Sequence, residues 1–134
     1  MLSEFWASWG SAGAAAVQRE FADMRGLARH VALLEDPPSR TQTALDCLLR
    51  KGATLGSCVF PVSDRQRSTY RSVRGAAAAI GVSYVPTLQW ICFRGQCPTV
   101  VGNVITYRDD HHITLTYARL LKVLIAARIE RAIR

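Results

Sequence analysis

Hydrophobic residues recur at three- and four-residue intervals in three stretches of the chain, and this spacing places them on one face of an α-helix. The stretches are residues 14–25, 65–80 and 113–134. Their apolar positions are Ala15, Val17, Phe21 and Met24, then Tyr70, Val73, Ala77 and Ile80, and finally Ile113, Tyr117, Leu120, Leu121, Leu124 and Ile125. Gly26 and Gly81 follow the first two stretches, and glycine accepts the left-handed conformation that often ends a helix. We therefore predict three helices.

Short β-like runs alternate with these helices at residues 30–35, 82–85 and 99–107. The third run is interrupted at Gly102-Asn103, so it predicts either a β-hairpin or a strand with a tight bend. The apolar residues 1–9 could be the end of a further buried strand. Strands that alternate with helices favour an α/β layered domain with a mainly parallel sheet. Active sites in such sheets gather at the carboxyl ends of strands, so the loop after residue 107 is a candidate location.

Length and charge narrow the class of protein. The 134 residues fit one domain, 1–134, with enough residues for a hydrophobic core. A net charge of +7 suggests attraction to anionic surfaces or polymers. The arginines are scattered, without the basic block or interleaved aromatics of a nucleic-acid groove, so we expect no nucleic-acid partner. No run approaches the ~20 apolar residues that cross a bilayer, and no secretory signal begins the sequence.

Four cysteines fall in or beside the less regular segments, at Cys47, Cys58, Cys92 and Cys97. Even cysteine usage in a small domain is compatible with disulfides and an oxidising compartment, and four cysteines allow three pairings. Four reduced, partly buried thiols are the alternative. The spacing differs from the tighter patterns of zinc sites, so we expect no metal and no other cofactor. If the chain begins at Met1 in the cell, we see no export route, which leaves the compartment open.

The densest group of chemically active side chains is the run from Tyr107 to Thr114, Tyr-Arg-Asp-Asp-His-His-Ile-Thr. A carboxylate three residues before a histidine can orient and charge-balance the imidazole, so that the ring acts as a general base. Asp109 and His112 have this spacing. The alternative is a solvated loop whose acidic residues favour the start of the following helix.

The segment from Cys92 to Ala118 resembles the end of an SGNH domain, of the kind fused to the C-terminus of bacterial membrane O-acyltransferases that modify cell-surface sugars. A weaker resemblance extends back to about Trp6. The resemblance implies a three-layer fold, with Asp109 as the orienting acid and His112 as the base of a Ser-His-Asp triad. It also implies local pairing of Cys92 with Cys97 and of Cys47 with Cys58. The glycan substrate, the acyl-donating membrane domain and the extracytoplasmic location of such proteins become expectations here.

This sequence departs from the family pattern because it holds no Gly-Asp-Ser nucleophile motif. Ser11, in Gly10-Ser11-Ala12-Gly13, fails the nucleophile-elbow pattern and is better suited to cap a helix. Gly102-Asn103 could suggest an oxyanion donor, but the resemblance places it in the segment leading to the acid–base block, so we interpret it as a turn. We therefore expect a partial SGNH domain that lacks its front part and is inactive or very weakly active alone.

The neighbouring residues have weaker interpretations. Arg108 could position an anionic or sugar substrate, although an ion pair with Asp110 is the simpler role. His111 could be mistaken for the base, and Thr114 is expected to start the helix. His30 begins a strand without a nearby carboxylate, which favours a structural role.

The competing hypothesis is a small basic binding or interaction protein with a degenerate SGNH-like fold and no catalysis. An uncovered sheet edge and apolar surface would then favour a homo-oligomer.

Overall fold

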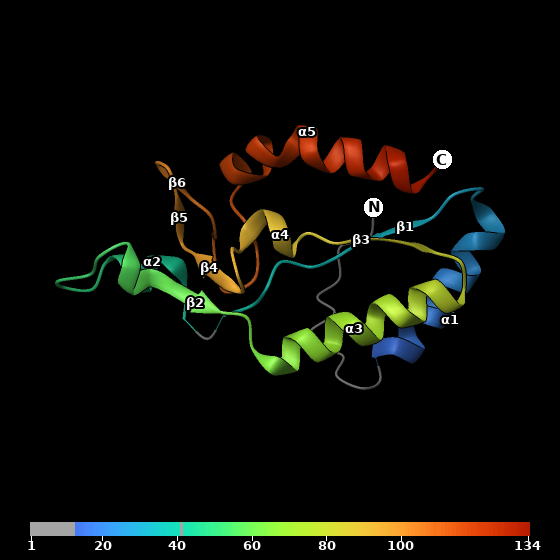
Figure 1. The fold of residues 1–134 in the computed structure, drawn as a ribbon, viewed down its shortest axis with the longest axis horizontal. Helices are drawn as coiled ribbons and strands as arrows, with labels where there is room; N and C mark the ends of the chain where they lie inside the picture. The colour runs from blue at the N-terminus through green and yellow to red at the C-terminus, as the bar shows by residue number, and fades with distance from the viewer. Residues whose placement is uncertain (1–12, 41) are drawn as a thin grey trace. The chain divides into compact units, whose positions relative to one another are not determined.

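The structure is a computed structural model that describes residues 13–40 and 42–134. Figure 1 labels its elements along the chain. The helices are α1 (Gly13–Leu27), α2 (Ala44–Leu48), the 3-10 helix η3 (Gly56–Cys58), α3 (Asp64–Ala79), α4 (Leu88–Ile91) and α5 (Leu115–Ala132). The strands are β1 (Ala32–Leu34), β2 (Val59–Pro61), β3 (Ser83–Val85), β4 (Gln96–Pro98), β5 (Val100–Val101) and β6 (Val104–Ile105). Helices and strands are interspersed along the chain, so the α/β class expected from the sequence is confirmed. In place of one mainly parallel sheet, the described strands form three two-stranded sheets, one parallel and two antiparallel.

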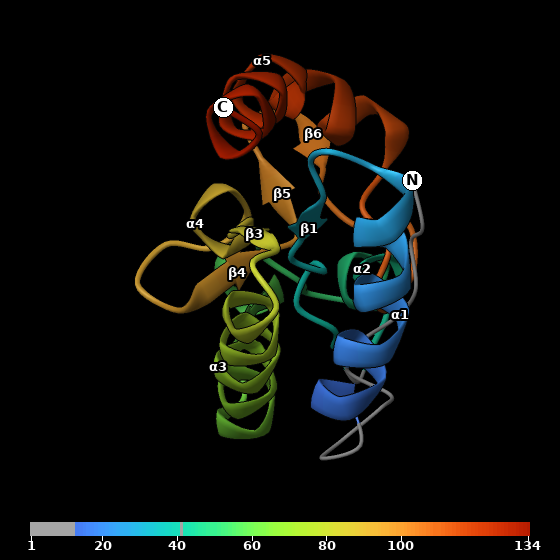
Figure 2. The same cartoon turned by 90° about the vertical axis from the view of Figure 1, so that its right-hand side faces the viewer.

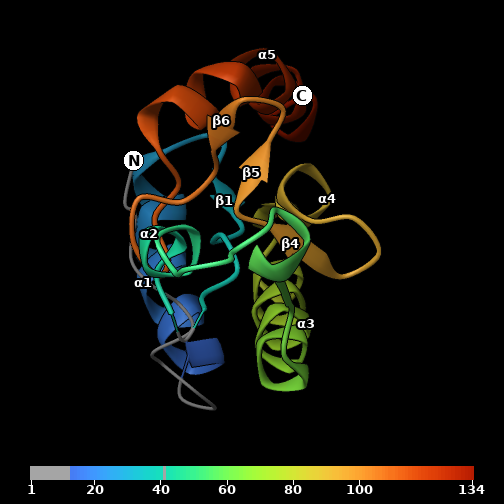
Figure 3. The same cartoon turned by 90° about the vertical axis from the view of Figure 1, so that its left-hand side faces the viewer.

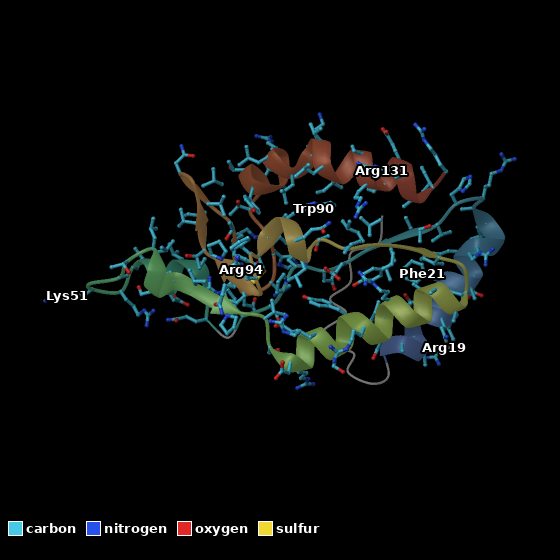
Figure 4. The ribbon with its side chains drawn as sticks, viewed as in Figure 1. Arg19, Phe21, Lys51, Trp90, Arg94 and Arg131 are labelled. Atoms are coloured by element: carbon cyan, nitrogen blue, oxygen red, sulfur yellow. A yellow bond between two sulfur atoms is a disulfide. The ribbon has the colours of Figure 1, made fainter. Side chains whose placement is uncertain are left out.

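The chain divides into two compact units, and the described residues of the first are 13–36, 63–86 and 126–134. In this unit β1 and β3 pair in parallel, with Leu33 opposite Tyr84. Helices α1 and α3 lie next to each other on the same side of this pair (Figure 2). Their buried core consists of Val17, Phe21, Leu33, Val73, Ala76, Ala77 and Val82. Phe21 of α1, labelled in Figure 4, belongs to this core.

The boundaries of α3 follow from local hydrogen bonds. The Ser63 side chain accepts from the Gln66 backbone N–H, and the Gln66 side chain accepts from the Ser63 N–H, which together form a capping box. At the other end, Gly81 has a φ of +67°, a left-handed conformation that glycine adopts without steric cost. The expected end of α3 at Gly81 is therefore confirmed. Gly26, in contrast, lies inside the last turn of α1 and has no positive φ, so its predicted role as a left-handed cap is wrong.

The second unit comprises residues 37–62 and 87–125. Strands β2 and β4 pair antiparallel with Phe60 opposite Cys97, and β5 and β6 form a hairpin. Gly102 has a φ of +60° at the hairpin turn, which confirms the expected turn at Gly102-Asn103. The chain leaves β6 and passes near α2 before it reaches α5 (Figure 3). The buried core of this unit consists of Ala44, Ile91, Tyr107, Tyr117 and Leu121.

Two disulfides stabilise the second unit, Cys47–Cys58 and Cys92–Cys97, and they are the expected local pairs. The first spans the loop from α2 to η3, and Figure 4 shows Lys51 at its tip. The second closes the turn between α4 and β4. The segment from residue 39 to residue 64 contains α2, η3 and β2.

The long C-terminal helix is present as predicted, but its apolar stripe is only partly buried. Tyr117 and Leu121 are buried, whereas Leu120 and Leu124 are 60% and 50% exposed. Positions 117 and 121 are four residues apart and share one face, while 120 and 124 lie on the next. Among the described residues, we find no helix that combines the length and the apolar character needed to span a membrane. Ser11 and the apolar residues 1–9 lie outside the described residues, and the expectation of one domain over residues 1–134 stays a prediction.

Candidate active site

The loop of residues 108–112 is closed by backbone contacts on both sides. Tyr107 and Ile113 form an isolated antiparallel bridge, and the Arg108 N–H donates to the His112 carbonyl over 2.8 Å. The Thr114 hydroxyl accepts from the Tyr117 N–H at 3.1 Å, which is the bond that an N-cap residue makes to the third residue of a helix. Thr114 therefore starts α5, as expected. The loop is joined directly to a hairpin on one side and a helix on the other.

Buried aromatic side chains anchor this loop to the rest of its unit. Tyr107 is 1% exposed, and its ring meets Phe60 edge-to-face with 5.4 Å between centroids. Tyr117 is buried in the first turns of α5 and donates its hydroxyl hydrogen to the Trp90 carbonyl at 2.6 Å. Both ends of the loop are thus fixed to a packed core.

The Asp109 carboxylate organises the loop from within. Its Oδ1 accepts hydrogen bonds from the backbone N–H groups of His111 at 3.0 Å and His112 at 2.7 Å. Partial desolvation raises the pKa of the Asp109 carboxyl. This effect is outweighed by the backbone hydrogen bonds from His111 and His112 and by the contact with the His112 ring. The pKa of Asp109 therefore lies well below its ordinary value. Asp109 is therefore a stable anion held in one orientation.

The His112 ring contacts this anion. Its Nδ1 lies 2.9 Å from Asp109 Oδ2 and 3.1 Å from Oδ1. In the neutral ring an Nδ1–H donated to the carboxylate leaves the lone pair on Nε2, which is the tautomer of a general base. The side chain is 50% exposed, so this nitrogen belongs to an accessible ring. The contact predicted from the spacing of Asp109 and His112 is present.

His111 makes a separate pair with the other carboxylate. Its Nδ1 lies 2.7 Å from Asp110 Oδ1, and its ring centroid is 3.9 Å from that of His112. Nδ1 of His111 is farther from Asp109 Oδ1, at 3.8 Å. The geometry therefore distinguishes the two histidines, because Asp109 orients the His112 ring and Asp110 contacts the His111 ring.

The predicted partner of Arg108 is corrected by the structure. Arg108 Nη2 lies 3.4 Å from Asp109 Oδ2, so its ion pair is with Asp109 and not with Asp110. Asp110 is turned toward His111, which accounts for the difference. The Arg108 side chain is 71% exposed, and exposed ion pairs of this kind stabilise a fold only weakly.

Arg40 is a neighbour of the loop that the sequence did not single out. Its backbone N–H donates to the Asp110 carbonyl at 2.8 Å, and its guanidinium carbon lies 4.6 Å from the centre of the Phe60 ring. Its buried Nε and Nη1 have no hydrogen-bond partner in the described structure. Burial lowers the pKa of Arg40, against the opposing effects of Tyr107 and Asp46. Arg40 belongs to no recognisable sequence motif, so no sequence pattern indicates its contact with the loop.

Several other sequence predictions concern residues away from this loop. Gly102 and Asn103 are exposed at the β5–β6 turn, and His30 is exposed just before β1. One group in the described residues could hold a metal ion, Asp109 with His111 and His112, although no metal was expected from the sequence.

A family model described as SGNH domain (fused to AT3 domains) matches residues 3–127. No curated protein and no solved structure gives a significant match. The match covers most of the chain, including the loop that carries Asp109 and His112. The chain therefore belongs to the family of SGNH domains that are fused to AT3 domains.

Proposed function

We propose that this chain supplies the acid–base half of an SGNH-type acyl-transfer site, and that the serine comes from a segment outside the 134 residues. The observation that carries the proposal is the 2.9 Å contact between His112 Nδ1 and Asp109 Oδ2. Two backbone N–H groups fix that carboxylate, so the ring is oriented before any substrate arrives. No Gly-Asp-Ser occurs in the sequence.

The proposed reaction begins when Nε2 of His112 accepts the serine hydroxyl proton as the serine oxygen attacks an acyl carbonyl. The bond between the acyl group and its donor then breaks, and His112 returns the proton to the departing group. In the second half, a sugar hydroxyl or water loses its proton to His112 and attacks the acyl-serine. The acyl group leaves on the acceptor and the serine regains its hydrogen. Asp109 stabilises the imidazolium formed in each half.

The family supports an AT3 acyltransferase domain as the partner, and we propose it as the membrane-bound acyl donor. A cell-surface glycan would be the acceptor. Two disulfides are compatible with an extracytoplasmic location, because such bonds persist in oxidising compartments. In this arrangement Arg108, exposed beside Asp109, would contact the anionic or hydroxyl-rich substrate.

The test is hydrolysis of p-nitrophenyl acetate by the purified chain, alone and mixed with a separately produced front part of an SGNH domain that carries Gly-Asp-Ser. We expect little activity from the chain alone and a gain on mixing. His112→Ala should remove that gain, with a loss larger than that caused by His111→Ala. His30→Ala is the matched control, because His30 is an exposed histidine of the other unit. Equal gains with wild type and His112→Ala would refute the proposal.

A non-catalytic binding protein is the second candidate, and two observations favour it: the sequence lacks the nucleophile motif, and its net charge is +7. Exposed Leu120, Val123 and Leu124 on α5 offer an apolar surface to a partner or to a second copy. Sedimentation equilibrium over a range of protein concentrations would detect a homo-oligomer. Oligomers without any reconstituted esterase activity would favour this candidate.

A further inference from the structure

The loop that orients His112 also gathers metal-binding atoms that catalysis does not require. Asp109, His111 and His112 each present one donor atom, and these three atoms lie within 4.8 Å of one another. All three side chains are at least 28% exposed, so an ion could reach them from solvent. Two imidazoles and a carboxylate suit Zn²⁺ and similar ions better than Mg²⁺ or Ca²⁺, which prefer oxygen ligands.

The spacing of the donors agrees with the size of a zinc site. Zinc bonds to nitrogen and oxygen are close to 2.0 Å, so neighbouring donors of a tetrahedral site lie about 3.3 Å apart. Asp109 Oδ1 is 3.1 Å from His112 Nδ1 and 3.8 Å from His111 Nδ1, values on either side of that separation. Both backbone hydrogen bonds to Asp109 fall on Oδ1, and the roughly four lone-pair sites of an ionised carboxylate are shared by its two oxygens. The capacity that remains for a metal is therefore on Oδ2, which lies 2.9 Å from His112 Nδ1.

We propose that Asp109, His111 and His112 form a surface site for a divalent transition ion, with Zn²⁺ as the test ligand, and that binding there switches off His112 as a base. The second part rests on the proposed acyl-transfer function. A metal on Nδ1 takes the lone pair at that nitrogen, and the hydrogen of the neutral ring then resides on Nε2. An Nε2–H is a donor and can no longer accept the serine proton.

Two neighbours modify the strength of this site. Asp110 Oδ1 lies 2.7 Å from His111 Nδ1, so its negative charge favours a cation, but the hydrogen bond between these two atoms must break before a metal can bind Nδ1. The Arg108 guanidinium is 3.4 Å from Asp109 Oδ2, where it competes with a cation for the same carboxylate. Removal of the arginine charge should therefore strengthen metal binding. A loop with only a structural role would not be expected to show this effect.

The binding test is calorimetric titration of the oxidised full chain with ZnCl₂ at constant pH, after a thiol assay has verified that both disulfides are intact. We expect one ion per chain. His111→Asn removes one of the three donors and should weaken binding by about 10-fold or more, because even the loss of a partner that only orients a ligand costs about that much. Arg108→Gln should tighten binding, and the remote control His30→Asn should leave it unchanged. Equal affinity in wild type and His111→Asn would overturn the proposal.

A second measurement identifies the nitrogen that binds. Long-range ¹H–¹⁵N spectra of the imidazoles distinguish a metal on Nδ1 from a metal on Nε2, and we expect Nδ1 for both His111 and His112. Binding through Nε2 alone would refute the proposed site, because the contacts that bring Asp109 and the two histidines together are made by their Nδ1 atoms. Both readouts are independent of catalysis, so a failed esterase reconstitution leaves the metal result intact. Where the esterase is reconstituted, Zn²⁺ should inhibit wild type at lower concentration than His111→Asn.

Discussion

The two disulfides should stabilise the fold to different extents, because they close loops of different length. Cys47 and Cys58 are 11 residues apart, whereas Cys92 and Cys97 are only 5 apart. The chain-entropy relation gives a stabilisation of about 3 kcal/mol for the longer loop and about 2 kcal/mol for the shorter one at 25 °C. Loss of the Cys47–Cys58 bond should therefore lower the free energy of unfolding more, by about 0.7 kcal/mol.

The assay is urea unfolding followed by far-ultraviolet circular dichroism. Two double variants, Cys47→Ala/Cys58→Ala and Cys92→Ala/Cys97→Ala, are each compared with oxidised wild type. Alanine also removes buried sulfur, so each variant is measured again after reduction, because reduction breaks its remaining disulfide without creating a cavity. Cys47, Cys58 and Cys97 are at most 2% exposed, which makes this control necessary. A larger loss from the Cys92–Cys97 pair in both comparisons would refute the entropy argument.

Three further predictions concern single positions. Gly81→Ala should destabilise the fold by about 1–2 kcal/mol, because φ is +67° and a new Cβ would lie 2.8 Å from Arg25 Nη1. Gly75→Ala is the contrasting variant: it lies inside α3, a Cβ there would meet nothing within 4 Å, and it should stabilise the fold by about 0.5–1 kcal/mol. Urea unfolding measures both changes. Tyr117→Phe should cost about 1 kcal/mol, because the Trp90 carbonyl loses the hydroxyl that donates to it, and an unchanged unfolding midpoint would contradict this role. The pKa of Asp109 is lowered on folding, so its ionised form contributes stability above the ordinary value of 3.8, and this stability is lost as pH falls toward the lowered folded pKa. The free energy of unfolding, measured at a series of pH values below 3.8, should therefore fall less for Asp109→Asn than for wild type.

The sequence predicted features that depend on neighbours along the chain. The three-residue step from Asp109 to His112 predicted their contact, because a turn of that length brings both side chains to one side. Gly102 and Gly81 predicted turns, because both have the positive φ that favours glycine. Thr114 was expected at a helix start, and its hydroxyl forms the corresponding bond.

Features that depend on distant residues were less predictable. The pairing of β2 with β4 joins two short strands that each contain a proline, Pro61 and Pro98, and neither has a clear alternating pattern. Arg40 packs over Phe60 and binds Asp110 through its backbone, contacts that no local pattern encodes. The exposure of Leu120 on α5 was not predicted. Periodicity indicates which residues share a face of a helix, but not how much of that face is covered by neighbouring elements.

The backbone hydrogen bonds around the loop of residues 108–112 have a consequence for how the domain could be divided. Thr114 donates its side-chain hydroxyl to the Ile105 carbonyl and its N–H to the Thr106 carbonyl, so the helix start is attached to the hairpin that precedes the loop. Asp109 and His112 are thus held within one short continuous segment, residues 105–114. A cut made ahead of residue 105 would keep Asp109, His112 and their local hydrogen bonds on one fragment, whereas Phe60 and Trp90, which anchor the loop, would be on the other. Association of the two fragments would then be needed to restore the packing around the loop.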